Sequence, residues 1–293
     1  MTRDRVIAIV NPAAGKGAGA RVALRIAAEL SAAGLSADVV STPAPGEAAR
    51  LASAAVEDGY ERVIAVGGDG TANEIANGLV GSEVALALYP IGSGNDFARA
   101  LGYPRKRKQL LPFLAQARTR RIDVGDVNGR VFLNAAGVGI DGHVAERIIA
   151  SARVVGPTLG YLVGALVSIA TYRPREMRVS VDGNVRRGKH LVVVAANGTH
   201  FGSGMHVAPD AKLDDGLLDI VVGGDLGRWA SVVALAKLYR GTHVDGRTIL
   251  SFRASALDVE LDEPLPMQAD GEASRASALR VRVRPRALTV LAR

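Results

Sequence analysis

The clearest indication of the architecture comes from residues 63–74, which read Val-Ile-Ala-Val-Gly-Gly-Asp-Gly-Thr-Ala-Asn-Glu. The apolar residues at its start are typical of a strand buried inside a parallel sheet. The glycines then interrupt the apolar pattern, and Thr71 is placed to cap a helix that begins at Ala72. The segment therefore predicts a strand, a Gly-rich turn and a helix, which together direct backbone N–H groups and a helix dipole at a phosphate.

Asp69 lies inside this turn, and its charge narrows the choice of ligand. A carboxylate beside phosphate groups is repulsive unless a metal ion or a hydrogen-bond donor lies between them. The turn therefore favours a magnesium–nucleotide site over a bare phosphate site. The segment has neither the spacing of a Walker A loop nor that of a Gly-x-Gly-x-x-Gly loop. Taken alone, it is equally compatible with an ordinary strand-to-helix turn.

The same alternation of buried strand and helix continues through the first part of the chain. Buried strands are expected at 6–10, 37–40, 63–66 and 84–88, with helices at 20–33, 47–57 and 72–79. Such alternation forms a parallel sheet, and ligands bind beyond the carboxyl ends of its strands. Polar turns fall at that edge at 11–17, 41–46, 67–71 and 92–96. Together they predict one nucleotide site, where Lys16 is placed to neutralise phosphate charge.

The pattern changes after about residue 121 to short alternating or apolar segments, which suit an antiparallel sheet or sandwich. The predicted fold is therefore α/β in two parts. An N-terminal doubly wound nucleotide-binding domain covers 1–121, and a C-terminal β-rich, sandwich-like domain covers 122–284, with a cleft between them. The final strand, 285–293, is a candidate to rejoin the first domain.

Composition limits the class of protein. The chain has 293 residues, no cysteine and a net charge of +7. The absence of cysteine excludes disulfides and thiolate metal sites. No apolar stretch reaches the ~20 residues of a transmembrane helix, and the opening residues 1–5 show no secretory signal, so a cytoplasmic protein is expected. The basic charge favours acidic partners such as nucleotides or an anionic membrane face, and no nucleic-acid partner is expected.

Two basic runs, 105–108 and 118–121, concentrate the positive charge. Near an anionic bilayer each such charge contributes about 1 kcal/mol of attraction. The runs are therefore candidates for peripheral contact with the inner face of a membrane. A solvated helix end is the alternative.

Three features of the second half are candidates for contact with lipid. Segment 158–172 is apolar nearly all round, which predicts a buried helix and leaves the wall of an acyl-chain pocket or a membrane-contact face as alternatives. The Gly-rich loop 200–205 is a candidate to line a lipid site, with a simple loop as the alternative. Trp229, on an expected helix over 226–239, is assigned to the core, with anchoring at a membrane interface as the alternative.

Three motifs resemble the bacterial diacylglycerol kinase-like soluble lipid kinases, a family related to sphingosine kinases and more distantly to NAD kinases. They are Asn-Pro-Ala-Ala-Gly-Lys at 11–16, Gly-Gly-Asp-Gly-Thr-Ala-Asn-Glu at 67–74 and Pro-Ile-Gly-Ser-Gly-Asn-Asp-Phe-Ala-Arg at 90–99. Two later segments, 212–219 and 269–272, resemble the same family. The likeness therefore covers nearly the whole chain, with five motifs in order.

The resemblance implies that the N-terminal domain binds ATP with Mg²⁺. The matching nucleotide positions are Asn11, Lys16, Thr42, Gly67, Gly68, Asp69, Gly70, Thr71, Glu74, Ser93, Asn95 and Asp96. Ser93 stands where many relatives carry threonine and keeps the hydroxyl. Asp69 is further expected to orient a catalytic Mg²⁺, directly or through water.

The resemblance also implies a structural Mg²⁺ site in the second domain. Its ligands would be the carbonyls of Lys212 and Leu217 and the carboxylate of Asp215. An acidic, oxygen-rich turn suits a hard cation. From the residues alone, Asp214-Asp215-Gly216 is equally an ordinary hairpin turn.

Glu272 stands where the family places its proton acceptor, and Asp270 is its rival as the catalytic base. From the residues alone, Asp270-Gly271-Glu272 is also a plain type I′ turn between two strands. Only the resemblance raises this turn to a catalytic role.

These expectations predict a lipid kinase that uses ATP and Mg²⁺ to phosphorylate the hydroxyl of diacylglycerol or a similar lipid at a membrane surface. The product would be phosphatidate or its analogue. A small-molecule kinase resembling NAD kinase is the first alternative, and a nucleotide- or lipid-binding regulator without turnover is the second. The sequence leaves open the acceptor lipid and the oligomeric state, a homodimer included.

Overall fold

The computed structural model describes residues 5–155 and 157–292, and among these the side chains of 148–161 are not described. The opening residues 1–4, on which the expectation of no secretory signal rests, lie outside the described residues. The chain divides into two compact units. One comprises the chain up to Ile122 together with the segment from Arg286, and the other comprises Asp123–Pro285. The division predicted from sequence was 121/122, with a final strand at 285–293.

The first unit is built on a parallel sheet. Its strands are β1 Val6–Val10, β2 Ala37–Ser41, β3 Arg62–Gly67, β4 Ala85–Pro90 and the end of β14, which runs over Glu272–Ala292. Their order is β14-β4-β3-β1-β2, and Val290 of β14 pairs in parallel with Leu86 of β4. Residues 63–67 are buried on both faces, which explains the continuous apolar segment.

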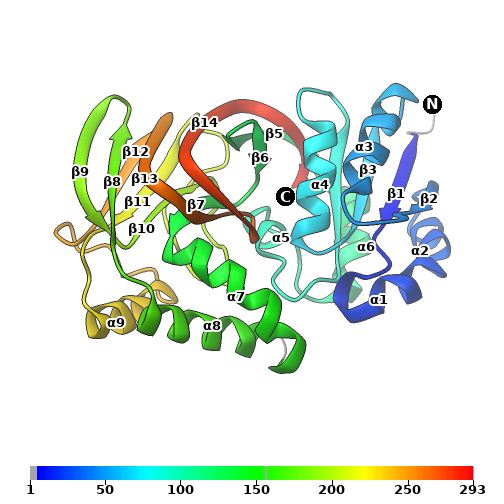
Figure 1. Cartoon of the computed structure of the whole chain (residues 1–293). Coiled ribbons are helices and arrows are strands. Elements are labelled where there is room, and N and C mark those ends of the chain that lie inside the picture. Colours follow the sequence, from blue (N-terminus) through cyan, green and yellow to red (C-terminus); the bar gives the residue numbers. More distant parts are fainter. Residues whose placement is uncertain (1–4, 156, 293) are drawn as a thin grey trace. The chain divides into compact units, whose positions relative to one another are not determined.

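Helices connect these strands (Figure 1). They are α1 Ala14–Ala23, α2 Ile26–Ala32, α3 Glu47–Glu57, α4 Asp69–Leu79, α5 Asp96–Ala100 and α6 Arg107–Gln116. The single helix expected over 20–33 is wrong, because two helices meet at Leu24 and Arg25. The helix start expected at Ala72 is also wrong: α4 begins at Asp69 after Gly68, so Thr71 lies inside its first turn and does not cap it.

The second unit is rich in antiparallel strands. They are β5 Arg118–Val127, β6 Arg130–Phe132, β7 Ala135–Gly139, β8 Arg175–Val181, β9 Asn184–His190, β10 Val192–Ala196, β11 Leu218–Gly223, β12 Ile249–Ala254 and β13 Ala256–Ala269. The main order is β12-β11-β10-β7-β13-β14, and the β8–β9 hairpin pairs with β13. An α/β first unit followed by a β-rich, sandwich-like second unit confirms the predicted fold class.

Alternation along β10 separates two apolar cores in this unit. Val193 and Ala195 face one core, and Val194 and Ala196 face the other. The second core is covered by helices, of which α7 covers Ile140–Val155, α8 covers Pro157–Thr171 and α9 covers Arg228–Leu238. The helix α7 packs against α8, and α9 lies beside α8 (Figure 1). None of the helices in the described part of the chain is long and apolar enough to cross a bilayer.

Candidate functional site

Three turns of the first unit touch one another through their backbones. A Cβ atom on Gly92 would lie 2.7 Å from the Cα of Gly68, and one on Gly15 would lie 2.4 Å from the carbonyl oxygen of Ile91. The Ile91 N–H donates to the Gly67 carbonyl at 2.8 Å. No other residue type fits at Gly92 or Gly15 without moving the backbone, which explains these glycines.

Asn11 and Thr71 join the same cluster through their side chains. The Asn11 amide donates to the Thr71 hydroxyl at 3.0 Å, and Thr71 is buried. A Cβ on Gly67 would lie 2.4 Å from the Thr71 side chain. The Thr42 N–H donates to the Val10 carbonyl at 2.8 Å, so Thr42 lies at the carboxyl end of β1. Four of the predicted nucleotide positions thus lie at one edge of the sheet.

Asp69 connects two of the turns. It is the first residue of α4, and its Oδ1 accepts the N–H of Phe97 in the first turn of α5 at 3.1 Å. Burial raises the pKa of the Asp69 carboxyl, and the Phe97 N–H opposes that rise. The carboxylate therefore holds the two Gly-rich turns together in addition to any role with a ligand.

The turn at 92–96 is closed by its own side chains. The Asn95 Oδ1 accepts the Gly92 N–H at 3.1 Å, and the Asn95 amide donates to the Gly92 carbonyl at 2.8 Å. Asp96 is buried and forms an ion pair with Arg99 at 2.7 Å. Ser93 is exposed, so its hydroxyl is available to a ligand. Arg99, to which no role was assigned from the sequence, neutralises the charge of the buried Asp96.

The remaining predicted nucleotide positions differ in their surroundings. Lys16 is exposed and has a positive φ of 57°, within a non-helical part of α1. A side chain added at Gly70 would meet open space. Glu74 accepts the Ala48 N–H at 3.3 Å and so contacts the start of α3. Because a helix leaves its first N–H groups without intrahelical partners, the start of α4 together with Lys16 suits an anion.

The two candidates for the catalytic base, Asp270 and Glu272, lie in different environments at the turn Asp270-Gly271. Asp270 and Gly271 have φ of 48° and 86°, as a type I′ turn requires between Ala269 and Glu272. Three backbone N–H groups donate to the Asp270 carboxylate, from Leu133, Asn134 and Ala135, at 2.6, 2.8 and 3.1 Å. Asp270 is therefore held by the backbone of the β6–β7 connection.

Glu272, in contrast, is an exposed side chain. Its carboxylate forms an ion pair with Arg130 at 2.5 Å, and both side chains remain close to half exposed. Such a pair leaves the carboxylate accessible to a substrate hydroxyl. The sequence did not single out Arg130.

Gln268 links this turn to a third carboxylate, Asp141 at the start of α7. Gln268 is buried; its amide donates to the Asp141 Oδ2 at 3.2 Å, and its Oε1 accepts the Gly271 N–H at 2.8 Å. Burial raises the pKa of Asp141 to about 6. The sequence missed both residues, because the strand register that brings them together is not a local signal.

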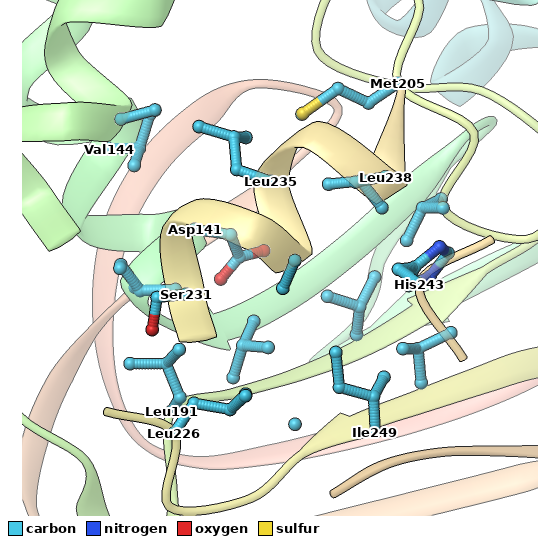
Figure 2. Close-up of a pocket in the computed structure, with 18 of the residues that line it drawn as sticks. Asp141, Val144, Leu191, Met205, Leu226, Ser231, Leu235, Leu238, His243 and Ile249 are labelled. Carbon is cyan, nitrogen blue, oxygen red and sulfur yellow. The ribbon is translucent and has the colours of Figure 1, made fainter. Parts of the chain in front are cut away.

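An apolar cavity of about 140 Å³ lies in the second unit beside Asp141 (Figure 2). Its walls come from α7, α8, α9 and strands β10 to β12, and include Val144, Ala165, Leu191, Met205, Leu235 and Ile249. Asp141, Ser231 and His243 are its polar lining residues. The helix α9 crosses the cavity in Figure 2 and contributes Leu235 and Leu238.

The sequence left contact with lipid open for the Gly-rich loop 200–205 and for the apolar segment 158–172, and residues of both line the cavity. The first expectation for 158–172, a buried helix, is wrong in part, because Leu162, Val163, Leu166 and Val167 of α8 are exposed. Phe201 and Met205 of the Gly-rich loop line the cavity, as do Ala165 and Ile169 of α8. Leu159 and Tyr161, part of the apolar segment on which α8 was predicted, have side chains outside the described residues. Trp229 is 85% exposed on α9 and does not lie in the core, because α9 turns its other face toward the sheet.

Asp215 is the one carboxylate among the predicted ligands of the structural magnesium site. The Asp215 carboxylate accepts the Leu217 N–H at 3.1 Å and forms an ion pair with Arg253, while Lys212 is exposed. Among the described residues no cluster of three or more His, Asp or Glu side chains could hold a metal. The donor set fits a cation only in part, since Arg253 competes for Asp215.

The basic runs are mostly on the surface. Arg105, Lys106 and Lys108 are exposed. Arg107 is engaged within the first unit: it donates to the Tyr89 hydroxyl at 2.5 Å and pairs with Glu29 at 3.3 Å. In the second run Arg118 and Arg120 are exposed and Arg121 forms an ion pair with Glu83. Arg107 and Arg121 therefore have protein partners already.

Two family models match the sequence, one of a diacylglycerol kinase catalytic domain over 5–127 and one of a YegS C-terminal NAD kinase beta sandwich-like domain over 134–292. A diacylglycerol kinase from Bacillus subtilis is 29% identical over 277 residues, 93% of this chain and 90% of that protein. A protein from Pseudomonas aeruginosa named "Probable lipid kinase YegS-like" is 33% identical over 293 residues, 99% of this chain and 95% of its own.

Among solved structures, a protein from Bacillus anthracis assigned to the diacylglycerol kinases superposes with a TM-score of 0.82 at 27% identity. The match covers 100% of this chain and 99% of that one. The sequence and structure matches thus extend over both units.

Proposed function

This chain belongs to the lipid kinases that join a diacylglycerol kinase catalytic domain to a YegS C-terminal domain, and we propose that it uses ATP and Mg²⁺ to phosphorylate the hydroxyl of diacylglycerol or a similar lipid. The product would be phosphatidate or its analogue. Because the acceptor is a membrane lipid, we place the reaction at the cytoplasmic face of a membrane with anionic lipids.

The observation that carries the acceptor class is the apolar cavity beside Asp141. Its lining is apolar except for Asp141, Ser231 and His243, as an acyl chain requires. Gln268 joins Asp141 to Gly271, so one end of the cavity is tied to the turn that carries Glu272. A soluble, highly polar acceptor such as NAD would gain nothing from this cavity.

The Gly-rich turns of the first unit supply the nucleotide site in this proposal. Backbone N–H groups at the start of α4 would hold the phosphates, and Lys16 would neutralise part of their charge. Ser93 would offer its exposed hydroxyl to the nucleotide. Thr42, Asn11 and Thr71 hold the same edge of the sheet in position.

Glu272 is our choice of proton acceptor over Asp270. A general base must reach the hydroxyl whose proton it takes, and Glu272 is exposed and forms one ion pair within the described part of the chain, to Arg130. The carboxylate of Asp270 is already engaged by three backbone N–H groups. In this proposal Asp270 shapes the turn and Glu272 accepts the proton.

Bound Mg²⁺ supplies charge neutralisation at the transferred phosphoryl group. Asp69 is the carboxylate of the Gly-rich turns that we assign to holding it, directly or through water. A second, structural Mg²⁺ at Asp215 and the carbonyls of Lys212 and Leu217 is part of the same proposal. It requires the cation to compete with Arg253.

The test is transfer of labelled γ-phosphate from ATP in the presence of Mg²⁺. Diacylglycerol in mixed micelles, a panel of other hydroxyl lipids and NAD would be offered as acceptors. Glu272→Gln is the informative variant, and Glu260→Gln is its matched control, because Glu260 is also an exposed strand glutamate paired with an arginine, Arg178, at 2.8 Å.

Label in phosphatidate that is lost in Glu272→Gln and kept in Glu260→Gln supports both the acceptor and the base. Label in another lipid would change the acceptor and keep the lipid kinase. Label in NAD alone, or ATP binding with no transfer to any acceptor, would overturn the proposal in favour of a small-molecule kinase or a binding regulator.

A further inference from the structure

The helix α8 is apolar on two opposite faces. Ala165, Ser168 and Ile169 are buried toward the interior of the second unit, and Ala165 and Ile169 line the cavity. The outer face carries a row of exposed apolar side chains: Leu162, Val163, Leu166 and Val167. A helix on the surface of a water-soluble domain normally keeps that face polar, so this row indicates a partner.

The neighbouring helix α9 also exposes apolar side chains on its outer face. Trp229 is 85% exposed and Val233, one turn later, is 54% exposed, while Leu235 and Leu238 on the other side pack on the core. The two helices lie beside each other (Figure 1). Tryptophan is enriched where one end of the ring meets apolar chains and the other meets water.

Between the end of α8 and the start of α9 lies a polar pocket of about 260 Å³. Its cationic lining residues are Arg173, Lys189 and Arg228, and each is exposed and forms no ion pair with another described residue. Asp225 is the carboxylate in the lining. Glu176 does not line the pocket, but it lies opposite Lys189 in the β8–β9 pair. The balance of charge in the pocket is positive.

This basic pocket adjoins the apolar cavity. The two share Ile169, Leu191, Leu226 and Ser231 as lining residues. A phosphate held at the cations would thus lie next to an apolar space, and the exposed apolar side chains of α8 and α9 flank it. Phosphate, acyl chain and interfacial aromatic residue are the elements of a phospholipid surface.

We propose that the outer faces of α8 and α9 dock on an anionic lipid bilayer, with the phosphate of a membrane phospholipid bound by Arg173, Lys189 and Arg228. The occupant is the bilayer, because unpaired cations and exposed apolar side chains occur together, and a soluble anion would need only the cations. The basic runs at 105–108 and 118–121, which were candidates from the sequence for membrane contact, are then secondary.

Trp229 provides a direct test, because it is the single tryptophan of the chain. Intrinsic fluorescence of the unmodified protein would be recorded with vesicles of phosphatidylcholine containing phosphatidylglycerol, and with phosphatidylcholine alone. We expect a blue shift with the anionic vesicles and quenching when their acyl chains are brominated. Binding by flotation without any change in Trp229 emission would overturn the assignment, as would a lack of binding to anionic vesicles.

A charge-matched pair of variants tests the phosphate pocket. Replacing Arg173, Lys189 and Arg228 by glutamine should weaken partition to anionic vesicles on the order of 100-fold, at about 1 kcal/mol per charge. The matched control, Arg105, Lys106 and Lys108 replaced by glutamine, removes the same charge and should cost about 5-fold or less. An equal or larger loss in the control would move the contact to the first unit and refute the proposal.

A phosphate control separates binding of the bilayer from binding of soluble phosphate. Inorganic phosphate at constant ionic strength should not displace the protein from vesicles; displacement would make the pocket a site for soluble phosphate. The measurement uses neither nucleotide nor acceptor. The proposal rests on the proposed function only in treating a membrane as the place of reaction, so a failed kinase assay and failed vesicle binding are distinguishable.

Discussion

The Gly-rich turns of the first unit and the apolar cavity of the second are two candidate binding sites built by different means. The turns are made of backbone, and contacts such as Gly92 against Gly68 leave no space for a Cβ atom. The cavity is made of side chains, brought from segments between Ile140 and Ile249 by the sheet and three helices. A site of the first kind is rigid and visible in the sequence, whereas one of the second kind adapts to its ligand and is hidden among core residues.

The comparison predicts that a small change in the turns costs more than a large change in the cavity, and Asp69 gives its strongest test. Asp69→Asn keeps an oxygen that can accept the Phe97 N–H but removes the charge. We expect about a 10³-fold loss in kcat/KM, the size typical of removing an electrostatic group at a reacting centre. Circular dichroism should show an unchanged fold.

The Asn variant separates two roles of Asp69. If the carboxylate only joins the turns, Asn should restore most of the activity that Asp69→Ala loses. Wild-type kinetics in the Asn variant would remove Asp69 from the metal site and weaken the contrast between the two sites.

The turn at 270–272 allows the second test, because one turn holds a structural and an accessible carboxylate. Glu272→Gln should lower kcat by about 10²-fold or more without a change in thermal stability, since an exposed ion pair contributes ~0–1 kcal/mol. Asp270→Ala should instead lower the free energy of unfolding, because three backbone N–H groups lose their acceptor. Each N–H group that stays buried without a partner costs ~1–3 kcal/mol. Urea unfolding and initial rates on both variants would measure this. A stable, inactive Asp270→Asn beside an active Glu272→Gln would exchange the two roles.

The third test concerns the single carboxylate of the cavity with a strongly shifted pKa. Burial raises the pKa of Asp141 to about 6, so the folded protein binds this proton more tightly than the unfolded chain. The contribution of the protonated Asp141 to the free energy of unfolding is fully present below about pH 4. It is lost as the pH rises through about 6, which lowers the free energy of unfolding by up to about 3 kcal/mol.

Asp141→Asn removes the titrating group and keeps a polar side chain for Gln268. We expect urea unfolding of this variant to lack the loss of stability between pH 4 and pH 7 that the unmodified protein shows. The difference between the two should be small at pH 4 and largest above pH 7. Parallel pH profiles for the two proteins would contradict a buried, protonated Asp141.

The smallest effect is expected inside the cavity itself. Ala234 lines it from α9, and Ala234→Phe should raise KM for long-chain acceptors about 10-fold while leaving KM for ATP unchanged. Ala27→Phe on the exposed side of α2, away from the proposed membrane face, is the control and should change neither. Equal effects on acceptors of every chain length would argue that the cavity does not hold the acyl chain.

Much of the first unit could be predicted because its signals are local. The bounds of β1, Val6–Val10, and α3, Glu47–Glu57, agree with the expectation from sequence. The start of α4 was misplaced, because the Thr71 hydroxyl accepts from Asn11, a partner sixty residues away, and not from its own helix. The intrinsic preference of threonine for helix N-caps predicted a cap at Thr71, but the hydrogen bond from Asn11 places Thr71 inside the first turn of the helix.

The second unit was predictable in class and much less in detail. Strands β13 and β14 are far longer than the short strands expected, since pairing with several neighbours extends them. The helix α9 is apolar on both sides, so its sequence does not say which face meets the sheet, and Trp229 was assigned to the wrong side. The roles of Gln268 and Asp141 depend on long-range register alone.

The strand β14 has a consequence for the order of events during protein synthesis. Its last residues, with Leu288, Val290 and Leu291 buried, complete the parallel sheet of the first unit beside β4. They follow the whole second unit in the chain, so they leave the ribosome only after Asp123–Pro285 has been made. At about 5–20 residues per second, the N-terminal strands wait many seconds for their final neighbour. Vectorial folding can finish the second unit first, and a nascent chain that stops before Arg286 exposes the edge of β4.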